Sequence, residues 1–183
     1  MAERGTQVVA LLRGINVGRH KRVRMADLRT LLQDAGYRDV RTHLQSGNVV
    51  ATAPIAAAKV APAMRDLIAG ALGLTVDVVV RTASELAAIV DADPLGKADA
   101  DGSKHLVVFL SDAPDPDAVA RLEAEDFGPE RWAVRGLEVY VWYPGGFRDS
   151  PLGKALSARP LAPIATARNW NTVTRVLEIA REG

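Results

Sequence analysis

A basic loop near the amino terminus carries the side chains best suited to bind an anion. The stretch "LLRGINVGRHKRVRM" contains Arg13, Arg19, Lys21, Arg22 and Arg24. Such cations, together with free N–H groups at a following helix start, can hold a phosphate or carboxylate. Gly14 and Gly18 form G-x-x-x-G, which is neither the dinucleotide-binding motif nor the P-loop. The alternative is a solvated basic loop whose glycines serve turn geometry.

Two further polar segments could complete such a site. They are "LQSGNV", with Gln45, Ser46 and Asn48, and "TARNWNTV", with Arg168, Asn169, Trp170 and Asn171. We expect charge from the arginines and Lys21, amide hydrogen bonds from the asparagines of these segments and Asn16, and one apolar wall from Trp170. The alternative for "LQSGNV" is a tight hairpin turn, with Gly47 or Asn48 at positive φ.

Cysteine and metal chemistry find no support. The absence of cysteine excludes disulfides, zinc thiolates and a cysteine nucleophile. The three histidines, His20, His43 and His105, have no partner at metal-ligand spacing. The stretch "DADPLGKADADG" lacks the core and the closing Glu of a calcium loop. We therefore predict no metal site, and neither a catalytic residue nor a cofactor can be assigned, which leaves open whether the chain is an enzyme.

Charge is distributed unequally along the chain. The net charge is +1, but residues 1–90 hold 12 Lys/Arg and 7 Asp/Glu, whereas residues 91–183 hold 11 and 15. An anionic ligand would therefore go first to the positive half. No apolar run approaches the roughly 20 residues of a membrane span. Absence of cysteine and of a signal-peptide pattern predicts a cytoplasmic protein without a membrane partner.

Hydrophobic periodicity predicts the same order of elements in both halves. In the first half the expected elements are a strand at 7–13, a helix at 25–35, two strands within 40–52, a helix at 57–72, a strand at 75–80 and a helix at 82–90. In the second half they are a strand at 105–110, a helix at 115–126, a hairpin at 131–144, a helix at 150–158, a short strand at 162–166 and a helix at 167–181.

This order predicts an α+β fold made of two ferredoxin-like (split βαβ) repeats, each followed by an extra helix. Residues 93–102 are expected to form a linker, because the stretch 91–104 around them is rich in Asp, Gly and Pro. The predicted domains are therefore 1–92 and 103–183. Alignment of the two halves places "RTASELAAIV" on "ATARNWNTV", so that Thr82 and Thr166 would be equivalent helix N-caps, and Glu85 and Asn169 equivalent third helical residues.

The assembled motifs resemble a known family. "VALLRGINVG", "MADLRTLLQDAGYRDVRTHLQSGNVV", "HLVVFL" and "TARNWNTVTRVLEIA" are similar to the bacterial family catalogued as domain of unknown function 1697. The resemblance implies an α+β protein built from ferredoxin-like pieces and implies no activity. Arg19 and Arg24 stand where the resemblance leads us to expect Gly and Pro, and Ala51 stands where an aromatic often follows. The loop is therefore more basic, and the strand less suited to stacking a base.

We therefore expect a protein that binds a small anionic or phosphate-bearing ligand at the basic loop, with contributions from the two polar segments. Nucleic-acid binding is one alternative, but the central strands "VVALLR" and "NVVAT" lack the aromatics that stack bases in RNA-recognition domains. A non-catalytic scaffold or dimerisation module is the other. The ligand and the oligomeric state are not identified by sequence, and neither is whether the three segments share one cleft.

Overall fold

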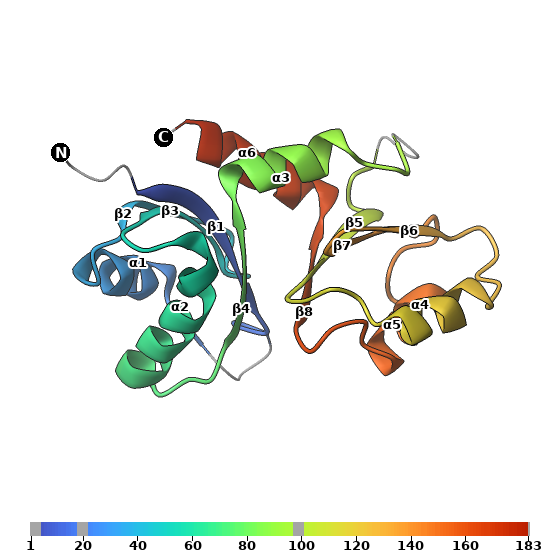
Figure 1. The fold of residues 1–183 in the computed structure, drawn as a ribbon, viewed down its shortest axis with the longest axis horizontal. Helices are drawn as coiled ribbons and strands as arrows, with labels where there is room; N and C mark the ends of the chain where they lie inside the picture. Colours follow the sequence, from blue (N-terminus) through green and yellow to red (C-terminus); the bar gives the residue numbers. More distant parts are fainter. Residues whose placement is uncertain (1–4, 18–21, 97–100, 183) are drawn as a thin grey trace. The chain divides into compact units, whose positions relative to one another are not determined.

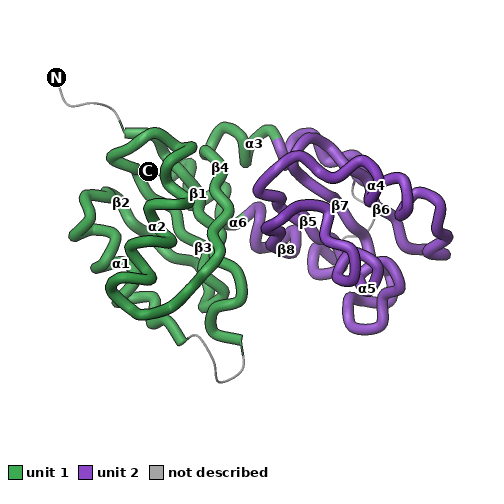
Figure 2. The backbone as a smooth tube through the Cα atoms, turned by 60° about the horizontal axis from the view of Figure 1, so that its bottom comes forward, with its two compact units in different colours: residues 1–88, 175–183 green, residues 89–174 purple. Residues whose placement is uncertain are grey.

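The computed structural model describes residues 5–17, 22–96 and 101–182. Unit 1 comprises residues 1–88 and 175–183, and unit 2 comprises residues 89–174 (Figure 2). The unit boundaries thus fall within two helices, α3 (Ala83–Asp91) and α6 (Trp170–Arg181).

The predicted order of elements, β-α-β-β-α-β-α in each half, is confirmed (Figure 1). The elements before α3 are β1 (Thr6–Arg13), α1 (Met25–Asp34), β2 (Arg38–His43), β3 (Asn48–Ala53), α2 (Ala57–Leu72) and β4 (Asp77–Thr82). Those between α3 and α6 are β5 (His105–Leu110), α4 (Pro116–Glu123), β6 (Arg131–Arg135), β7 (Glu138–Trp142), α5 (Pro151–Ala158) and β8 (Ala165–Asn169).

Each unit contains a four-stranded antiparallel sheet. The strand orders are β2-β3-β1-β4 and β6-β7-β5-β8, so that the first strand of each half lies between its third and fourth. Because β1 and β5 have hydrogen-bonded neighbours on both sides, they are buried, and this explains why both are nearly continuous apolar runs.

One face of the first sheet packs against α1 and α2. Alternate residues of β1, including Val8 and Leu12, meet helical residues at a spacing of three or four, such as Leu28 and Leu32 on α1 and Met64 on α2. These side chains are almost fully buried, and truncating one of them to alanine typically costs about 2–5 kcal/mol. This burial holds α2 together although Pro62 lies in its second turn, further inside the helix than its ring prefers.

The second sheet is covered in the same way by α4 and α5. Its core includes Leu110 and Val139 from the strands, Leu122 from α4 and Leu152 from α5. Helix α4 is shorter than the predicted 115–126, and Asp115 caps it by accepting a hydrogen bond from the backbone N–H of Asp117.

The opposite face of each sheet is also buried. In unit 1 this face carries Val9, Leu11 and Val50, and the guanidinium of Arg41 on β2 donates to the carbonyl oxygen of Ile179 on α6 at 3.4 Å. In unit 2 it carries Phe109 and Tyr140 among others, and the Tyr140 hydroxyl donates to the carbonyl oxygen of Ile89 on α3 at 2.8 Å. Residues of α6 and α3 therefore contact the faces that the other four helices leave uncovered.

The predicted boundary before the last helix is wrong. Residues 167–169 belong to β8, so α6 begins at Trp170 instead of at 167. Thr166 consequently pairs with Phe109 in the sheet and is not an N-cap. The cap is Asn169, whose side-chain oxygen accepts from the backbone N–H of Thr172 at 2.9 Å. Asn169 is therefore not the third helical residue either.

The corresponding prediction for the first half is confirmed. The Thr82 hydroxyl accepts from the Glu85 backbone N–H at 3.1 Å, and the Glu85 carboxylate accepts from the Thr82 backbone N–H at 2.7 Å. This is a capping box. Thr82 thus corresponds to Asn169, three residues later than in the alignment that matched the two threonines.

Replacing the newly assigned cap tests this correction. We expect Asn169→Ala to lower the free energy of unfolding by about 1 kcal/mol, because a helix N–H loses its acceptor. Asn171→Ala, at an exposed position of the same helix, is the matched control and should stay within about 0.5 kcal/mol of the parent. Urea denaturation measures both. Equal stability of Asn169→Ala and the parent would contradict the capping role.

Candidate functional site

The side chain of Asn16 joins three segments of unit 1. Its amide nitrogen donates to the carbonyl oxygens of Val23 at 2.9 Å and Gln45 at 2.8 Å, and its amide oxygen accepts from the Val23 N–H at 2.8 Å. The end of β1, the residues before α1 and the turn between β2 and β3 are therefore held together. We call the described residues 13–17, 22–24 and 44–48 the loop–turn cluster.

The turn within this cluster is packed closely against β1. Gly47 has a φ of 79°, as predicted for this hairpin, and its carbonyl oxygen accepts from the Leu12 N–H at 2.8 Å. A Cβ atom at Gly47 would lie 2.6 Å from a methyl carbon of Ile15, so a side chain could not fit without movement. Asn48 is fully buried, and its amide nitrogen donates to the His43 carbonyl oxygen and the Ser46 hydroxyl.

The two asparagines of the cluster therefore have structural roles. The polar side chains directed to solvent in the cluster are instead those of Arg13, Arg22, Arg24, Gln45 and Ser46. Arg13 lies 3.5 Å from the Asp77 carboxylate on β4, an exposed pair worth about 0–1 kcal/mol. Arg24 precedes α1 and places no side-chain cap on its first N–H groups. Arg19 and Lys21 lie outside the described residues.

In unit 2, Arg168 is buried in β8, with 9% of its surface exposed. Its guanidinium donates to the Thr166 hydroxyl at 2.8 Å and to the Ala167 carbonyl oxygen at 2.9 Å. Burial lowers the pKa of Arg168 to about 10, so the side chain is still a cation at neutral pH. The hydroxyl that was predicted to cap a helix thus serves as an acceptor for this buried charge.

The residues after Arg168 surround a histidine. Trp170 stacks on the His105 ring, with centroids 4.5 Å apart and an interplanar angle of 2°. The Trp170 backbone N–H donates to the Gly102 carbonyl oxygen, and the exposed Asn171 occupies the space where Gly102 would carry a Cβ. The Asn169, Trp170 and Asn171 string thus closes the start of α6 against the segment before β5.

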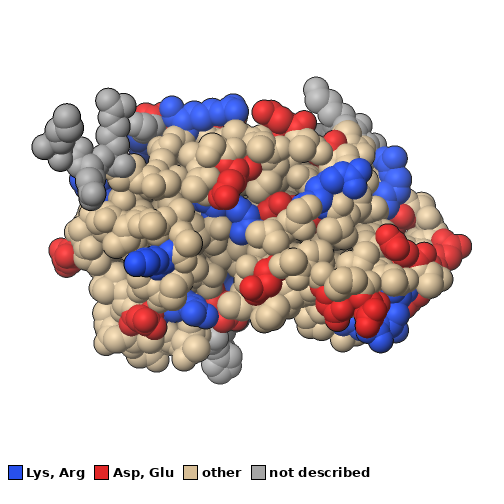
Figure 3. Space-filling model, in the orientation of Figure 1, with Lys and Arg blue, Asp and Glu red and all other residues tan. Residues whose placement is uncertain are grey.

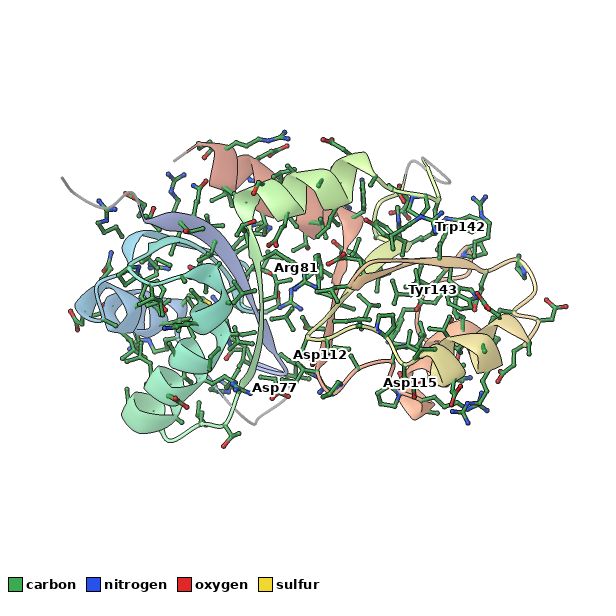
Figure 4. The ribbon with its side chains drawn as sticks, in the orientation of Figure 1. Asp77, Arg81, Asp112, Asp115, Trp142 and Tyr143 are labelled. Atoms are coloured by element: carbon green, nitrogen blue, oxygen red, sulfur yellow. The ribbon has the colours of Figure 1, made fainter. Side chains whose placement is uncertain are left out.

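Sequence reasoning missed His105 as a member of a cluster. Its Nε2 lies 3.5 Å from the Asp93 carboxylate. Its direct cross-strand neighbour is Trp142 on β7, which is labelled in Figure 4. His105 Nε2 and Trp142 Nε1 are two of the three buried side-chain atoms without a hydrogen-bond partner among the described residues, and the third is the Tyr37 hydroxyl. Burial lowers the pKa of His105, and Asp93 opposes that effect. No sequence spacing links Asp93 to His105, because the contact depends on the path of the chain after α3.

A second missed residue is Arg81, which occupies on β4 the position that Arg168 occupies on β8 (Figure 4). Each precedes the helix cap by one residue, pairs with a valine of the central strand, and donates to the carbonyl oxygen of the residue before it. Both are buried. Alignment of "VRTA" with "ARNW" would have revealed the pair, and the alignment by threonine hid it.

On the face drawn in Figure 3, Lys/Arg and Asp/Glu side chains both occur, scattered among other residues. The described part of the chain holds no group of three or more His, Asp or Glu placed to bind a metal ion. No helix among the described residues has the length and apolarity to cross a bilayer. Whether residues 166–172 share a cleft with the loop–turn cluster stays a prediction.

Together these features define a two-unit α+β protein with polar clusters in each unit. Residues 6–140 match the family described as "Protein of unknown function (DUF1697)", and the chain belongs to this family. The resemblance at 166–180 lies beyond the matched residues. No curated protein matches this chain.

A solved structure shares the fold. The conserved bacterial protein SP0830 from Streptococcus pneumoniae is similar over 96% of this chain and 98% of its own, with a TM-score of 0.80 and 22% sequence identity. This likeness shows a common arrangement of helices and strands. Ligand and activity have to be argued from the residues of this chain.

The Asn16 contacts can be tested by stability. Asn16→Gly should lower the free energy of unfolding by about 2–4 kcal/mol, because three backbone groups lose their partner while the φ of 56° remains accessible. Asn16→Ala should cost more, since alanine disfavours that φ. Gln45→Ala is the control, because the bond uses the Gln45 backbone, and it should change stability by less than about 0.5 kcal/mol. An Asn16→Gly protein as stable as the parent would exclude this role.

His105 should make stability depend on pH. Its pKa is lower in the folded than in the unfolded chain, so the unfolded chain binds the proton more readily. The stabilisation is complete above the unfolded value, about 6.5, and is lost progressively as the pH falls towards the folded value. His105→Gln should reduce the slope of unfolding free energy between about pH 7.5 and 5.5. His43→Gln is the comparison variant and should change the slope in the same direction, because burial and Arg175 also lower the pKa of His43. An unchanged slope in His105→Gln would refute the assignment.

Proposed function

We propose that this protein binds a small anionic ligand, such as a phosphate-bearing compound, at the loop–turn cluster. The observation that carries the proposal is the set of hydrogen bonds from Asn16, which gathers the end of β1, the start of α1 and the β2–β3 turn in one place. Asn16 and Asn48 support this arrangement through the backbone, so ligand contact falls to the exposed side chains around them.

Charge and helix geometry favour an anion there. Arg22 and Arg24 are exposed immediately before α1, and the first turn of α1 receives no side-chain cap. Free N–H groups at a helix start attract anions, and guanidinium groups bind phosphate and carboxylate through two parallel hydrogen bonds. Arg13 adds a further cation, although Asp77 partly offsets it. Arg19 and Lys21, which the sequence analysis assigned to the site, lie outside the described residues and stay part of the proposal by their place in the sequence.

The proposal does not depend on residues 166–172. Arg168 is buried, Asn169 caps α6 and Trp170 stacks on His105, so Asn171 is the exposed member of that segment. A small ligand is also favoured over nucleic acid. The central strands β1 and β3 carry no aromatic side chain for base stacking, and charges of both signs occur on the face drawn in Figure 3.

The repeat interpretation belongs with this proposal. We infer that both units are ferredoxin-like, since each has the β-α-β-β-α-β order and an antiparallel sheet with the first strand between the third and fourth. The equivalent positions of Arg81 and Arg168, and of the caps Thr82 and Asn169, support descent of the two halves from one unit. Domain limits of 1–92 and 103–183 and a cytoplasmic location remain proposals beside it.

Charge removal tests the site. In the parent, inorganic phosphate and pyrophosphate should raise the melting temperature, as any ligand of the folded state does. Arg22→Gln with Arg24→Gln should weaken the affinity at least about tenfold, because charge-assisted hydrogen bonds are lost. Lys59→Gln with Arg65→Gln removes the same charge from exposed positions of α2 and should leave the affinity unchanged.

Three outcomes would count against the proposal. An equal loss of phosphate affinity in both double variants would indicate a general effect of net charge. Steeply salt-dependent binding of short RNA or DNA without phosphate binding would favour the nucleic-acid alternative. Absence of both kinds of binding would favour the scaffold.

A further inference from the structure

A leucine in the loop–turn cluster adopts a backbone conformation that leucine disfavours. Leu44 has a φ of 59°, in the left-handed region where Gly and Asn are usual and a bulky side chain is an outlier. Its side chain is 56% exposed, so packing in the described structure does not explain the choice of residue. Gly or Asn at this position would relieve the backbone cost and lose little burial.

The surrounding hydrogen bonds hold Leu44 in this conformation. The residue before it, His43, accepts at its carbonyl oxygen from the Asn48 amide at 2.8 Å. The residue after it, Gln45, accepts at its carbonyl oxygen from the Asn16 amide at 2.8 Å. The turn is thus fixed on both sides of Leu44, and the leucine side chain is presented to solvent at a defined place. Strained residues held by their surroundings are concentrated at functional sites.

A second exposed aliphatic side chain belongs to the same cluster. Val17 is 70% exposed and follows Asn16 in the chain, and Leu44 precedes Gln45. The two aliphatic residues are therefore the chain neighbours of Asn16 and Gln45, which are joined by a hydrogen bond. Among the described residues, the exposed large hydrophobics are Val17, Leu44 and Phe147, and two of these three lie in the loop–turn cluster. The cluster therefore presents aliphatic as well as basic side chains to solvent.

We infer that the ligand of the loop–turn cluster is an amphipathic anion, a phosphate or carboxylate that carries an alkyl or aryl group. This inference rests on the proposed anion binding. The arginines before α1 would hold the charged end, and Leu44 and Val17 would contact the apolar group. Two side chains suit a group of small-molecule size, since a stable protein interface buries upward of about 1,000 Å². Removal of that apolar group from water adds affinity in proportion to the area covered.

The test compares two probes that differ only in the apolar group. Calorimetric titration of the full chain with inorganic phosphate and with hexyl phosphate should show about tenfold tighter binding of hexyl phosphate, which corresponds to about 1.4 kcal/mol. Leu44→Asn should remove most of this preference and leave the affinity for inorganic phosphate unchanged, while its melting temperature rises because Asn accepts the φ of 59°. Val17→Asn should reduce the preference independently of any backbone effect.

Phe147→Ser is the matched control, because it removes an exposed hydrophobic residue of unit 2 and should retain the full preference. A preference for hexyl phosphate that survives Leu44→Asn would overturn this inference and leave the anion site standing. Equal affinity of the parent for inorganic phosphate and hexyl phosphate would also overturn this inference and leave the anion site standing. If neither probe binds, the proposed function fails, and the amphipathic ligand with it.

Discussion

Each sheet of this protein is apolar on both faces, and that constraint determines much of the structure. Helices α1 and α2 bury Val8 and Leu12, but the same strand carries Val9 and Leu11 on its other side, and these are buried as well. Two helices per half therefore cannot be sufficient. Residues of α6 reach the sheet of unit 1 through Arg41, and residues of α3 reach the sheet of unit 2 through Tyr140. The helix that follows each repeat is thus part of the core.

Burial of both faces also limits where a ligand could bind. A domain that binds RNA on its sheet presents aromatic side chains on an open face. Here the second face of β1 is aliphatic and buried, which favours the proposed location of a ligand in the loops at the strand ends. Loops carried by a rigid scaffold are the usual location of binding residues. The Asn16 hydrogen bonds give the loop–turn cluster the fixed geometry that a loop needs for this purpose.

The order of elements was predictable because it depends on local periodicity, and β5 and α2 have the predicted limits. The end of β8 was not, since Arg168 and Asn169 are polar residues in a strand and the residue types there do not alternate between apolar and polar. A buried arginine is satisfied by the Thr166 hydroxyl and a carbonyl oxygen, contacts that depend on the folded sheet. The Asp93–His105 contact could not be predicted from sequence either, because it joins the segment after α3 to the start of β5 and so depends on the folded structure.

The motifs that indicate the family and the side chains that could contact a ligand are largely different residues. Within "LLRGINVG", "QSGNVV" and "TARNWNT", the asparagines Asn16, Asn48 and Asn169 all bond to backbone groups. An amide side chain provides both a donor and an acceptor at a fixed separation, which suits it to closing turns. Family-specific sequence motifs of this kind therefore indicate how the loops are stabilised. The proposed ligand site therefore depends on residues without such a role, the exposed arginines and the strained, exposed Leu44, because folding alone does not require them.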